Sequence, residues 1–282
     1  MNNWNYLQAQ RWAVDYLKSR GKDPYAPEFL LKMLHDWDTT TLLMHHRDPM
    51  PADEQKRFCR AIKRVAEDEP VQYIVGKAPF FNRTFVISPD VLIPEPETED
   101  LVEWVLKDMP KDQPLKVLDL GTGSGVIGIT LKLERPNWQV MLSDISADAL
   151  RVAQANQRLH GTNLPVQESD LFSALEDEKF DVIVTNPPYV SPSAVDQMDQ
   201  SVLKYEPPLA LFASENGLGF YHRLFAEAAR HLTPNGRLFG ETGYDQEETI
   251  QELLKRLNPQ AEIETRHDEA DKMRMIQAWN FR

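Results

Sequence analysis

From about residue 94 onward, apolar segments of strand length alternate with helical segments, and this alternation limits the possible folds most strongly. The expected strands are residues 116–120, 139–144, 181–185, 236–242 and 273–279. Helical patterns lie between them, for example over residues 147–159, 218–232 and 246–257. Apolar strands that alternate with helices are typical of parallel sheets covered on both faces. We therefore expect a doubly wound α/β sheet, in which ligands bind beyond the carboxyl ends of the strands.

The preceding residues follow different patterns, and we expect two parts there. Residues 1–70 carry three helical apolar stripes that predict a small helical bundle, with a partner-docking surface as the alternative. The stripes are Tyr6, Ala9, Ala13 and Tyr16 or Leu17; Phe29, Leu30, Met33, Leu34 and Trp37; and Phe58, Ala61, Ile62 and Val65. Residues 71–93 contain strand patterns at 80–81, 84–87 and 91–93, which predict a β-hairpin linker. The predicted parts are thus 1–70, 71–93 and 94–282.

The charge is distributed unevenly along the chain. Residues 1–93 hold 13 Lys and Arg against 12 Asp and Glu, whereas residues 94–282 hold 18 against 32. An acidic domain repels a phosphate backbone, so no direct nucleic-acid partner is expected. The chain has one cysteine, Cys59, no apolar run of about 18 residues and no secretory signal pattern at its N-terminus. We expect a cytoplasmic monomer that binds neither a membrane nor a metal ion.

A glycine-rich turn directly follows the first expected strand of the sheet. It consists of Gly121, Thr122, Gly123, Ser124 and Gly125, and a helical pattern begins after it. Glycines adopt unusual φ angles and let the backbone approach a ligand, as nucleotide binding requires. Asp144 ends the next strand, where a carboxylate can accept both hydrogens of a ribose diol. The pattern predicts a ligand that contains a nucleoside, with a purely structural turn as the alternative.

Residues 123–128 also read G-x-G-x-x-G, the dinucleotide pattern, so NAD is another candidate ligand. Two features favour S-adenosylmethionine. Asp119 precedes the glycines, and its carboxylate could face a ligand ammonium group. In addition, the motif that follows the strand at 181–185 has no use in hydride transfer.

That motif is Asn186, Pro187, Pro188 and Tyr189. The Asn186 side-chain oxygen and the Pro187 carbonyl can each accept one hydrogen of an NH2 group, and the prolines hold that carbonyl without a competing backbone donor. Tyr189 offers a flat face to a planar amide or base. Such nitrogens are weak nucleophiles, so they must be aimed at the methyl group. We predict methyl transfer to a planar nitrogen, with a simple loop after a strand as the alternative.

With these motifs the chain resembles the release-factor glutamine methyltransferase family over nearly its whole length. The resemblance rests on residues 70–76 (PVQYIVG), 92–99 (LIPEPETE), 121–125, 144–150 (DISADAL), 186–189, 205–207 and 216–221. It implies a Rossmann-like class I methyltransferase domain and a small helical N-terminal domain that helps to grip the substrate, joined by the β-hairpin. Glu95 occupies a position that is usually arginine in this family.

The resemblance also implies the reactants and the roles of the site residues. The acceptor would be the glutamine side chain of the Gly-Gly-Gln motif in peptide-chain release factors, and the methylation would modulate translation termination. The cofactor would be S-adenosyl-L-methionine. Residues 121–125 would surround its methionine part, Asp144 would hold the ribose, and Asp170 and Leu171 would border the adenine. Asn186 would lie between cofactor and acceptor, with Pro187, Pro188 and Tyr189 also at the acceptor.

Two other functions remain open at this point. A methyltransferase that modifies the exocyclic amine of adenine would present the same geometry to Asn186 and Tyr189. The acidic charge of residues 94–282 and the segment 92–99 favour the protein acceptor instead. A protein that binds the cofactor without catalysis is the third candidate.

Overall fold

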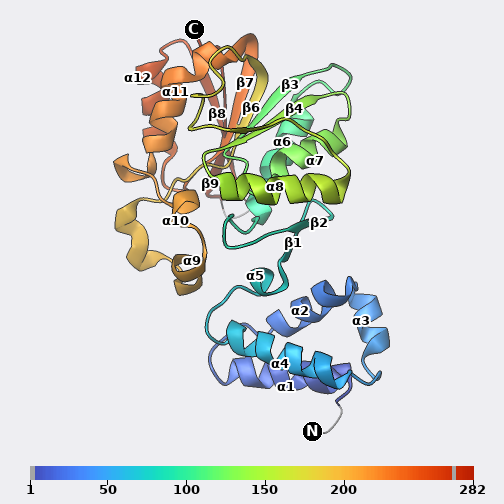
Figure 1. Cartoon of the computed structure of the whole chain (residues 1–282). Coiled ribbons are helices and arrows are strands. Elements are labelled where there is room, and N and C mark those ends of the chain that lie inside the picture. The colour runs from blue at the N-terminus through green and yellow to red at the C-terminus, as the bar shows by residue number, and fades with distance from the viewer. Residues whose placement is uncertain (1–3, 269–270) are drawn as a thin grey trace. The chain divides into compact units, whose positions relative to one another are not determined.

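The computed structural model describes residues 4–268 and 271–282, and the chain divides into two compact units (Figure 1). Unit 1 contains the described residues up to Lys77 together with Asp199–Tyr205. Unit 2 contains Ala78–Met198 and the described residues from Glu206 to Arg282. The segment Asp199–Tyr205 therefore belongs to unit 1, although the residues before and after it in the sequence belong to unit 2.

Unit 1 is helical, and its core is the set of apolar faces that its helices share. The helices are α1 (Tyr6–Lys18), α2 (Ala26–His35), α3 (Thr39–His45), α4 (Ala52–Val65), α5 (Val71–Val75) and α9 (Gln200–Tyr205). The first and third predicted stripes are confirmed, because Tyr6, Ala9, Ala13 and Leu17 of α1 and Phe58, Ala61, Ile62 and Val65 of α4 are all buried. The stripe on α2 is partly wrong. Leu31 is buried there, whereas Leu34 is 47% exposed.

Unit 2 contains a seven-stranded sheet whose order reverses in its middle. Its strands are β3 (Lys116–Leu120), β4 (Gln139–Asp144), β5 (Val166–Glu168), β6 (Phe180–Thr185), β7 (Leu232–Glu241), β8 (Glu262–His267) and β9 (Met273–Trp279). The order is β5-β4-β3-β6-β7-β9-β8. All neighbours are parallel except β9, which is antiparallel to both β7 and β8. The prediction of a doubly wound α/β sheet is confirmed.

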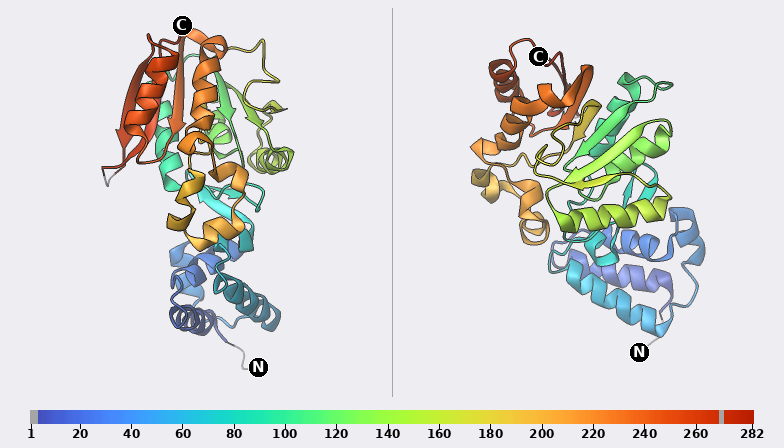
Figure 2. Two further views of the ribbon diagram at one scale, coloured as in Figure 1. Left: turned by 90° about the vertical axis from the view of Figure 1, so that its left-hand side faces the viewer. Right: turned by 45° about the horizontal axis from the view of Figure 1, so that its top comes forward.

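Helices cover both faces of this sheet (Figure 2). The helices of unit 2 are α6 (Pro96–Asp108), α7 (Val126–Glu134), α8 (Ala147–His160), α10 (Pro208–Leu211), α11 (Gly219–His231) and α12 (Glu247–Leu257), with 3-10 turns η1 (Pro192–Gln197) and η2 (Glu215–Gly217). Alternate residues of a strand point to opposite faces. Val117 of β3 accordingly packs in the core under α6 and α7, whereas Leu118 packs in the core under α11 and α12.

The predicted hairpin is a two-stranded sheet of β1 (Lys77–Phe80) and β2 (Arg83–Val86). Phe81 and Asn82 have φ angles of 49° and 58°, as a tight turn between twisted strands requires. The expected third strand at residues 91–93 is wrong, since that segment is irregular and carries cavity-lining residues instead. Residues 71–75, placed in the linker by the sequence, form α5.

Within residues 4–268 and 271–282, none of the helices combines the length and apolar character that a membrane crossing requires. The same residues contain no group of three or more His, Cys, Asp or Glu side chains placed to hold a metal ion.

Candidate active site

The candidate site lies where the strand order of the sheet reverses. β3 pairs in parallel with both β4 and β6, so the segments that follow β3 and β6 leave the same edge of the sheet side by side. The glycine turn follows β3, and the Asn186 tetrapeptide follows β6. A Cβ added to Gly121 would lie 3.9 Å from the Thr185 hydroxyl oxygen. In doubly wound sheets such a reversal point is where ligands bind.

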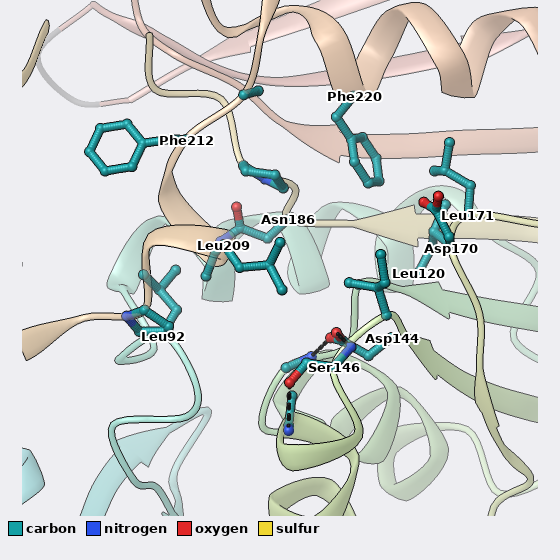
Figure 3. A pocket seen from close by; sticks show the side chains of 18 of the residues that line it. Leu92, Leu120, Asp144, Ser146, Asp170, Leu171, Asn186, Leu209, Phe212 and Phe220 are labelled. Carbon is teal, nitrogen blue, oxygen red and sulfur yellow. Dashed lines mark hydrogen bonds between the residues drawn. The ribbon is translucent and has the colours of Figure 1, made fainter. Parts of the chain in front are cut away.

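A cavity of about 320 Å³ opens at this point, entirely within unit 2 (Figure 3). Its walls come from the ends of β3 and β4, the segments after β5 and β6, residues 90–92, residues 207–214 and the start of α11. The lining residues with predicted roles are Gly121, Gly123, Asp144, Asp170, Leu171, Asn186 and Pro188. Thr122, Ser124, Gly125, Pro187 and Tyr189 are not among the lining residues.

The glycine turn has the backbone shape that the sequence predicts. Gly121, Gly123 and Gly125 have φ angles of 70°, 54° and 83°, which side chains strongly disfavour. Gly125 also lacks space, because an added Cβ would lie 2.9 Å from Ile129 Cδ1. The Asn156 amide of α8 donates to the Ser124 carbonyl and bonds both backbone groups of Val86, so α8 ties the turn to β2.

Asp119 supports the glycine turn from below and does not line the cavity. It is fully buried, and its Oδ2 accepts hydrogen bonds from Thr122 Oγ1 at 2.5 Å and from the Gly128 amide at 2.8 Å. Burial raises the pKa of Asp119 to about 7, and the charge of Asp144 adds to this rise. Asp119 is therefore not at the cavity surface, where it was expected to contact a ligand ammonium group. Its bonds hold the loop to α7.

Asp144 lines the cavity at the end of β4 (Figure 3). Its Oδ2 accepts from the Gly123 amide at 2.8 Å, and its Oδ1 accepts from the Ser146 amide at 2.9 Å. Burial raises the pKa of Asp144, and these backbone donors act against that rise. Because a carboxylate oxygen has two acceptor sites, each oxygen can still accept a hydroxyl hydrogen. The predicted contact with two ribose hydroxyls fits this arrangement.

Apolar side chains form the part of the wall beyond Asp144. Figure 3 shows Leu120, Leu171 and Phe220 there, beside the Asp170 carboxylate. Asp170 pairs with Arg223 of α11 at 2.9 Å. Leu171 has a φ of 51°, and its carbonyl accepts from the Ser169 hydroxyl. This combination of apolar walls and a charged pair suits a flat, weakly polar ring such as adenine.

Asn186 lines the cavity on the side formed by Leu92 and Leu209 (Figure 3). Its Nδ2 donates to Thr98 Oγ1 at 3.0 Å, which leaves Oδ1 as the side-chain group able to accept from a ligand. Pro187 is buried, and Pro188 lines the wall. Tyr189 donates its hydroxyl to Glu241 Oε1 at 3.1 Å, and its carbonyl accepts from the Gln246 amide. The expected stacking face of Tyr189 is thus not part of this cavity wall.

Acidic side chains gather behind the tetrapeptide. Glu241 is fully buried, and burial raises its pKa to about 7. Burial also raises the pKa of Glu206 to about 7, although its carboxylate accepts from the Ile93 amide. Burial and the charge of Glu97 raise the pKa of Glu95, the residue in the usual arginine position. This negative field favours cationic groups nearby.

Several residues of the site had no predicted role. Phe220, Arg223 and Ser146 line the cavity, and Thr98 and Glu241 hold Asn186 and Tyr189 from behind. Thr98 and Phe220 lie in the segments 92–99 and 216–221, which the sequence analysis used only for the resemblance. Glu241 ends an apolar strand, like Asp144, and that position is the one signal for it.

The chain matches two family models and several known methyltransferases. A family model described as the PrmC N-terminal domain matches residues 8–76, and one described as the methyltransferase small domain matches residues 101–205. The release factor glutamine methyltransferase of Enterococcus faecalis is 38% identical over 93% of this chain and 95% of its own length. That of Lactococcus lactis is 40% identical over 94% and 97%. A solved methyltransferase from Pyrococcus furiosus has a TM-score of 0.54 at 16% identity, covering 82% of this chain and 100% of that one.

Proposed function

This chain belongs to the release factor glutamine methyltransferase family, and we propose that it methylates the glutamine of the Gly-Gly-Gln motif in peptide-chain release factors. The methyl group comes from S-adenosyl-L-methionine and is placed on the side-chain amide nitrogen, N5, of that glutamine. The methylated release factor then acts in translation termination, which this modification modulates. The enzyme is thus a protein-(glutamine-N5) methyltransferase.

The residues of the cavity fit the methyl donor. Asp144 offers two acceptor positions for the ribose hydroxyls, and Leu120, Leu171 and Phe220 offer apolar contact to the adenine. Gly121 and Gly123 bring the backbone to the cavity surface without side chains. Bound there, the cofactor supplies an electrophilic methyl group on a positively charged sulfur. The negative charge of Asp144 and of the carboxylates behind the tetrapeptide favours that cation.

The observation that carries the proposal is the orientation of Asn186. Its NH2 group is bound by Thr98, so its oxygen remains to accept a hydrogen of the acceptor amide. We assign the second hydrogen to the backbone carbonyl of Pro187, which lies between the cavity-lining residues Asn186 and Pro188, although the Pro187 side chain itself is buried. Two fixed acceptors restrict the rotation of the NH2 group and hold its nitrogen in one direction. They also stabilise the positive charge that the nitrogen gains as its bond to the methyl carbon forms and the carbon–sulfur bond breaks. The nitrogen then loses one proton to water.

The helical unit and the acidic second half support a protein acceptor. We expect unit 1 to contact the release factor away from the Gly-Gly-Gln motif, so that the motif itself needs few contacts in the cavity. The net charge of residues 94–282 disfavours DNA and RNA as acceptors. We propose that the enzyme acts as a monomer.

Methyl transfer from labelled S-adenosylmethionine to a purified release factor tests the proposal. We expect incorporation into the wild-type release factor and none into a variant whose Gly-Gly-Gln glutamine is replaced by glutamate, since a carboxylate offers no N–H. Ribosomal RNA and duplex DNA serve as competing acceptors in the same assay. Greater incorporation into either nucleic acid would assign the site to a base amine instead.

A further inference from the structure

Hydrogen bonds through Thr98 and Glu241, both buried, connect Asn186 to the interior of unit 2 and to Tyr189. Asn186 Nδ2 donates to Thr98 Oγ1 at 3.0 Å, and Thr98 Oγ1 donates to Glu241 Oε2 at 2.7 Å. The Tyr189 hydroxyl donates to the other oxygen of Glu241 at 3.1 Å. Thr98 is 3% exposed and Glu241 is 1% exposed, so water does not compete for these bonds. All four residues lie in unit 2.

We propose that Thr98 and Glu241 are positioning residues that fix the direction of the Asn186 amide, so that its oxygen and not its NH2 group faces the methyl acceptor. This inference rests on the proposed function, because the direction matters only for an acceptor that donates N–H. Neither residue lines the cavity. They act on the reaction through Asn186.

The direction follows from counting protons along the chain of bonds. An ionised carboxylate can only accept hydrogen bonds, so the single hydrogen of the Thr98 hydroxyl goes to Glu241. The Thr98 oxygen is then left as an acceptor toward Asn186. An amide that meets an acceptor must present its NH2 group to it, which turns its oxygen to the opposite side. The buried Glu241 carboxylate thereby determines that Asn186 Oδ1, and not its NH2 group, faces the cavity.

Protonation of Glu241 would remove this constraint. A carboxylic acid can donate its hydrogen to Thr98 Oγ1, and the Thr98 hydroxyl can then donate to Asn186 Oδ1. The amide would rotate and present its NH2 group to the acceptor, where two sets of N–H donors would face each other. The two arrangements satisfy equally many bonds in the interior, so the charge on Glu241 selects between them.

The groups around Glu241 place this change near neutral pH. Burial is the largest cause of the raised pKa of about 7 at Glu241, and the negative charges of Glu95 and Glu97 raise it further. The hydrogen bonds from Thr98 and Tyr189 act in the opposite direction. Tyr221 of α11 donates to the Glu241 backbone carbonyl at 2.6 Å, so it does not neutralise the carboxylate. Arg274 of β9 is bound to Asp268 at 2.9 Å.

The decisive variant is Thr98→Val, which keeps the shape of the side chain and removes its hydroxyl. We expect kcat for release-factor methylation to fall about 10-fold or more, because Asn186 then takes both directions. Thr98→Ser keeps the hydroxyl and should restore most of the rate. Thr130→Val is the matched control, since Thr130 is also fully buried on a helix but its hydroxyl has no hydrogen-bond partner. Calorimetry with S-adenosylhomocysteine should give the same Kd for all variants.

The pH dependence separates positioning from a structural effect. In the wild type and in Thr98→Ser, kcat should rise as the pH increases through about 7, as Glu241 loses its proton. Glu241→Gln cannot titrate at this position, so its profile should lack that rise, and this holds even if Thr98→Val fails to fold. The inference would be overturned if Thr98→Val kept the wild-type kcat and the wild-type pH profile of kcat. It would also be overturned if Glu241→Gln kept the wild-type pH profile. A wild-type enzyme that methylates no release factor would instead overturn the proposed function.

Discussion

At the scale of single residues, Asn186 is the side chain on which the chemistry depends most. Its amide nitrogen donates a hydrogen bond to Thr98, and the residue lines the cavity, where its oxygen remains to accept from a ligand. The methyl donor is held mainly elsewhere, by Asp144 and the apolar wall around Leu171. Loss of Asn186 should therefore affect the reacting nitrogen much more than it affects cofactor binding.

We expect Asn186→Ala to reduce kcat by about 10²–10³-fold, the usual effect of removing one positioned group that stabilises developing charge. The Kd for S-adenosylmethionine should stay within about 3-fold of the wild-type value, because uniform binding is largely retained. Single-turnover kinetics and calorimetry measure the two quantities. Asn163→Ala, at an exposed loop position, is the control and should leave both unchanged. Near-normal turnover of Asn186→Ala would exclude the acceptor contact.

The fully buried carboxyl groups of Asp119 and Glu241 should make the stability of the protein depend on pH. Burial raises the pKa of Asp119 from 3.8 and that of Glu241 from 4.5, each to about 7. At a pH between the ordinary and the raised pKa values, the folded protein therefore binds more protons than the unfolded chain. The contribution of these two groups to the free energy of unfolding is therefore largest below about pH 4 and falls as the pH rises to about 7. Each group lowers the free energy of unfolding by at most roughly 1.4 kcal/mol per pH unit.

Urea unfolding over this pH range tests the sign and the assignment. Asp119→Asn keeps an oxygen for Thr122 and Gly128 but cannot ionise, so its free energy of unfolding should fall less steeply from about pH 5 to about pH 8 than that of the wild type. Asp112→Asn, at an exposed position, should keep the wild-type slope. Equal slopes in the Asp119 variant and the wild type would contradict the assignment.

At the scale of elements, the contact between α7 and the sheet fixes the glycine turn. Gly128 lies on the first turn of α7, and a Cβ there would lie 2.3 Å from Leu142 Cδ2 and 2.9 Å from Asp119 Oδ2. A side chain at this position would push α7 away from β3 and β4. The turn of residues 121–125 starts this helix and would move with it.

We expect Gly128→Ala to lower the free energy of unfolding by roughly 1–3 kcal/mol, as other overpacked core positions do. The same variant should weaken S-adenosylmethionine binding, because the turn is displaced. Gly161→Asn is a suitable comparison, since an added Cβ there meets nothing within 4 Å and asparagine tolerates its positive φ. Denaturation and calorimetry measure both effects. A Gly128 variant as stable as the Gly161 variant would contradict this packing.

The sequence predicted best those strands that are mostly buried. β3, β4 and β9 have the expected bounds, because Gly121, Asp144 and Asn280 mark their carboxyl ends. β5 and β8 were missed. β5 has only three residues, and β8 is an edge strand with many polar side chains and little burial. The expected strand at 91–93 was wrong because this segment is irregular and its residues Val91 and Leu92 line the cavity.

The candidate site was predictable where it follows the ends of strands. Gly121, Asp144 and Asn186 each stand just after or at the end of an apolar strand, and all three line one cavity. Thr98 and Glu241 could not be connected to Asn186 from the sequence, because they are 88 and 55 positions from it. The hydrogen bonds that join them arise from the packing of α6 against β7.

At the scale of the whole molecule, the enzyme must find one glutamine side chain in a folded protein. The cavity provides contacts for the cofactor and for one planar amide, which offers little surface for recognising a large partner. Unit 1 is a separate helical unit with its own core and takes no part in the cavity as described. We therefore assign to it the binding of the release factor away from the motif.

This division predicts that a short peptide is a poor substrate. A Gly-Gly-Gln peptide of about ten residues should show a kcat/KM at least about 10²-fold below that of the intact release factor, because remote binding energy is lost. Initial rates with each acceptor, at saturating S-adenosylmethionine, give this ratio. A peptide containing Gly-Gly-Asn serves as the background control. Equal kcat/KM values for peptide and protein would mean that unit 1 does not contribute to substrate binding.

We propose that the site places a methyl group on the nitrogen of one glutamine side chain. Tandem mass spectrometry of a release factor, treated with this enzyme and S-adenosylmethionine, measures it directly. We predict a mass increase of one methyl group on the Gly-Gly-Gln glutamine, located on its side-chain nitrogen, and no such increase when Asn186→Ala replaces the wild type for the same short time. A methyl group on another residue, or an unmodified release factor after treatment with the wild type, would show that the proposed reaction is wrong.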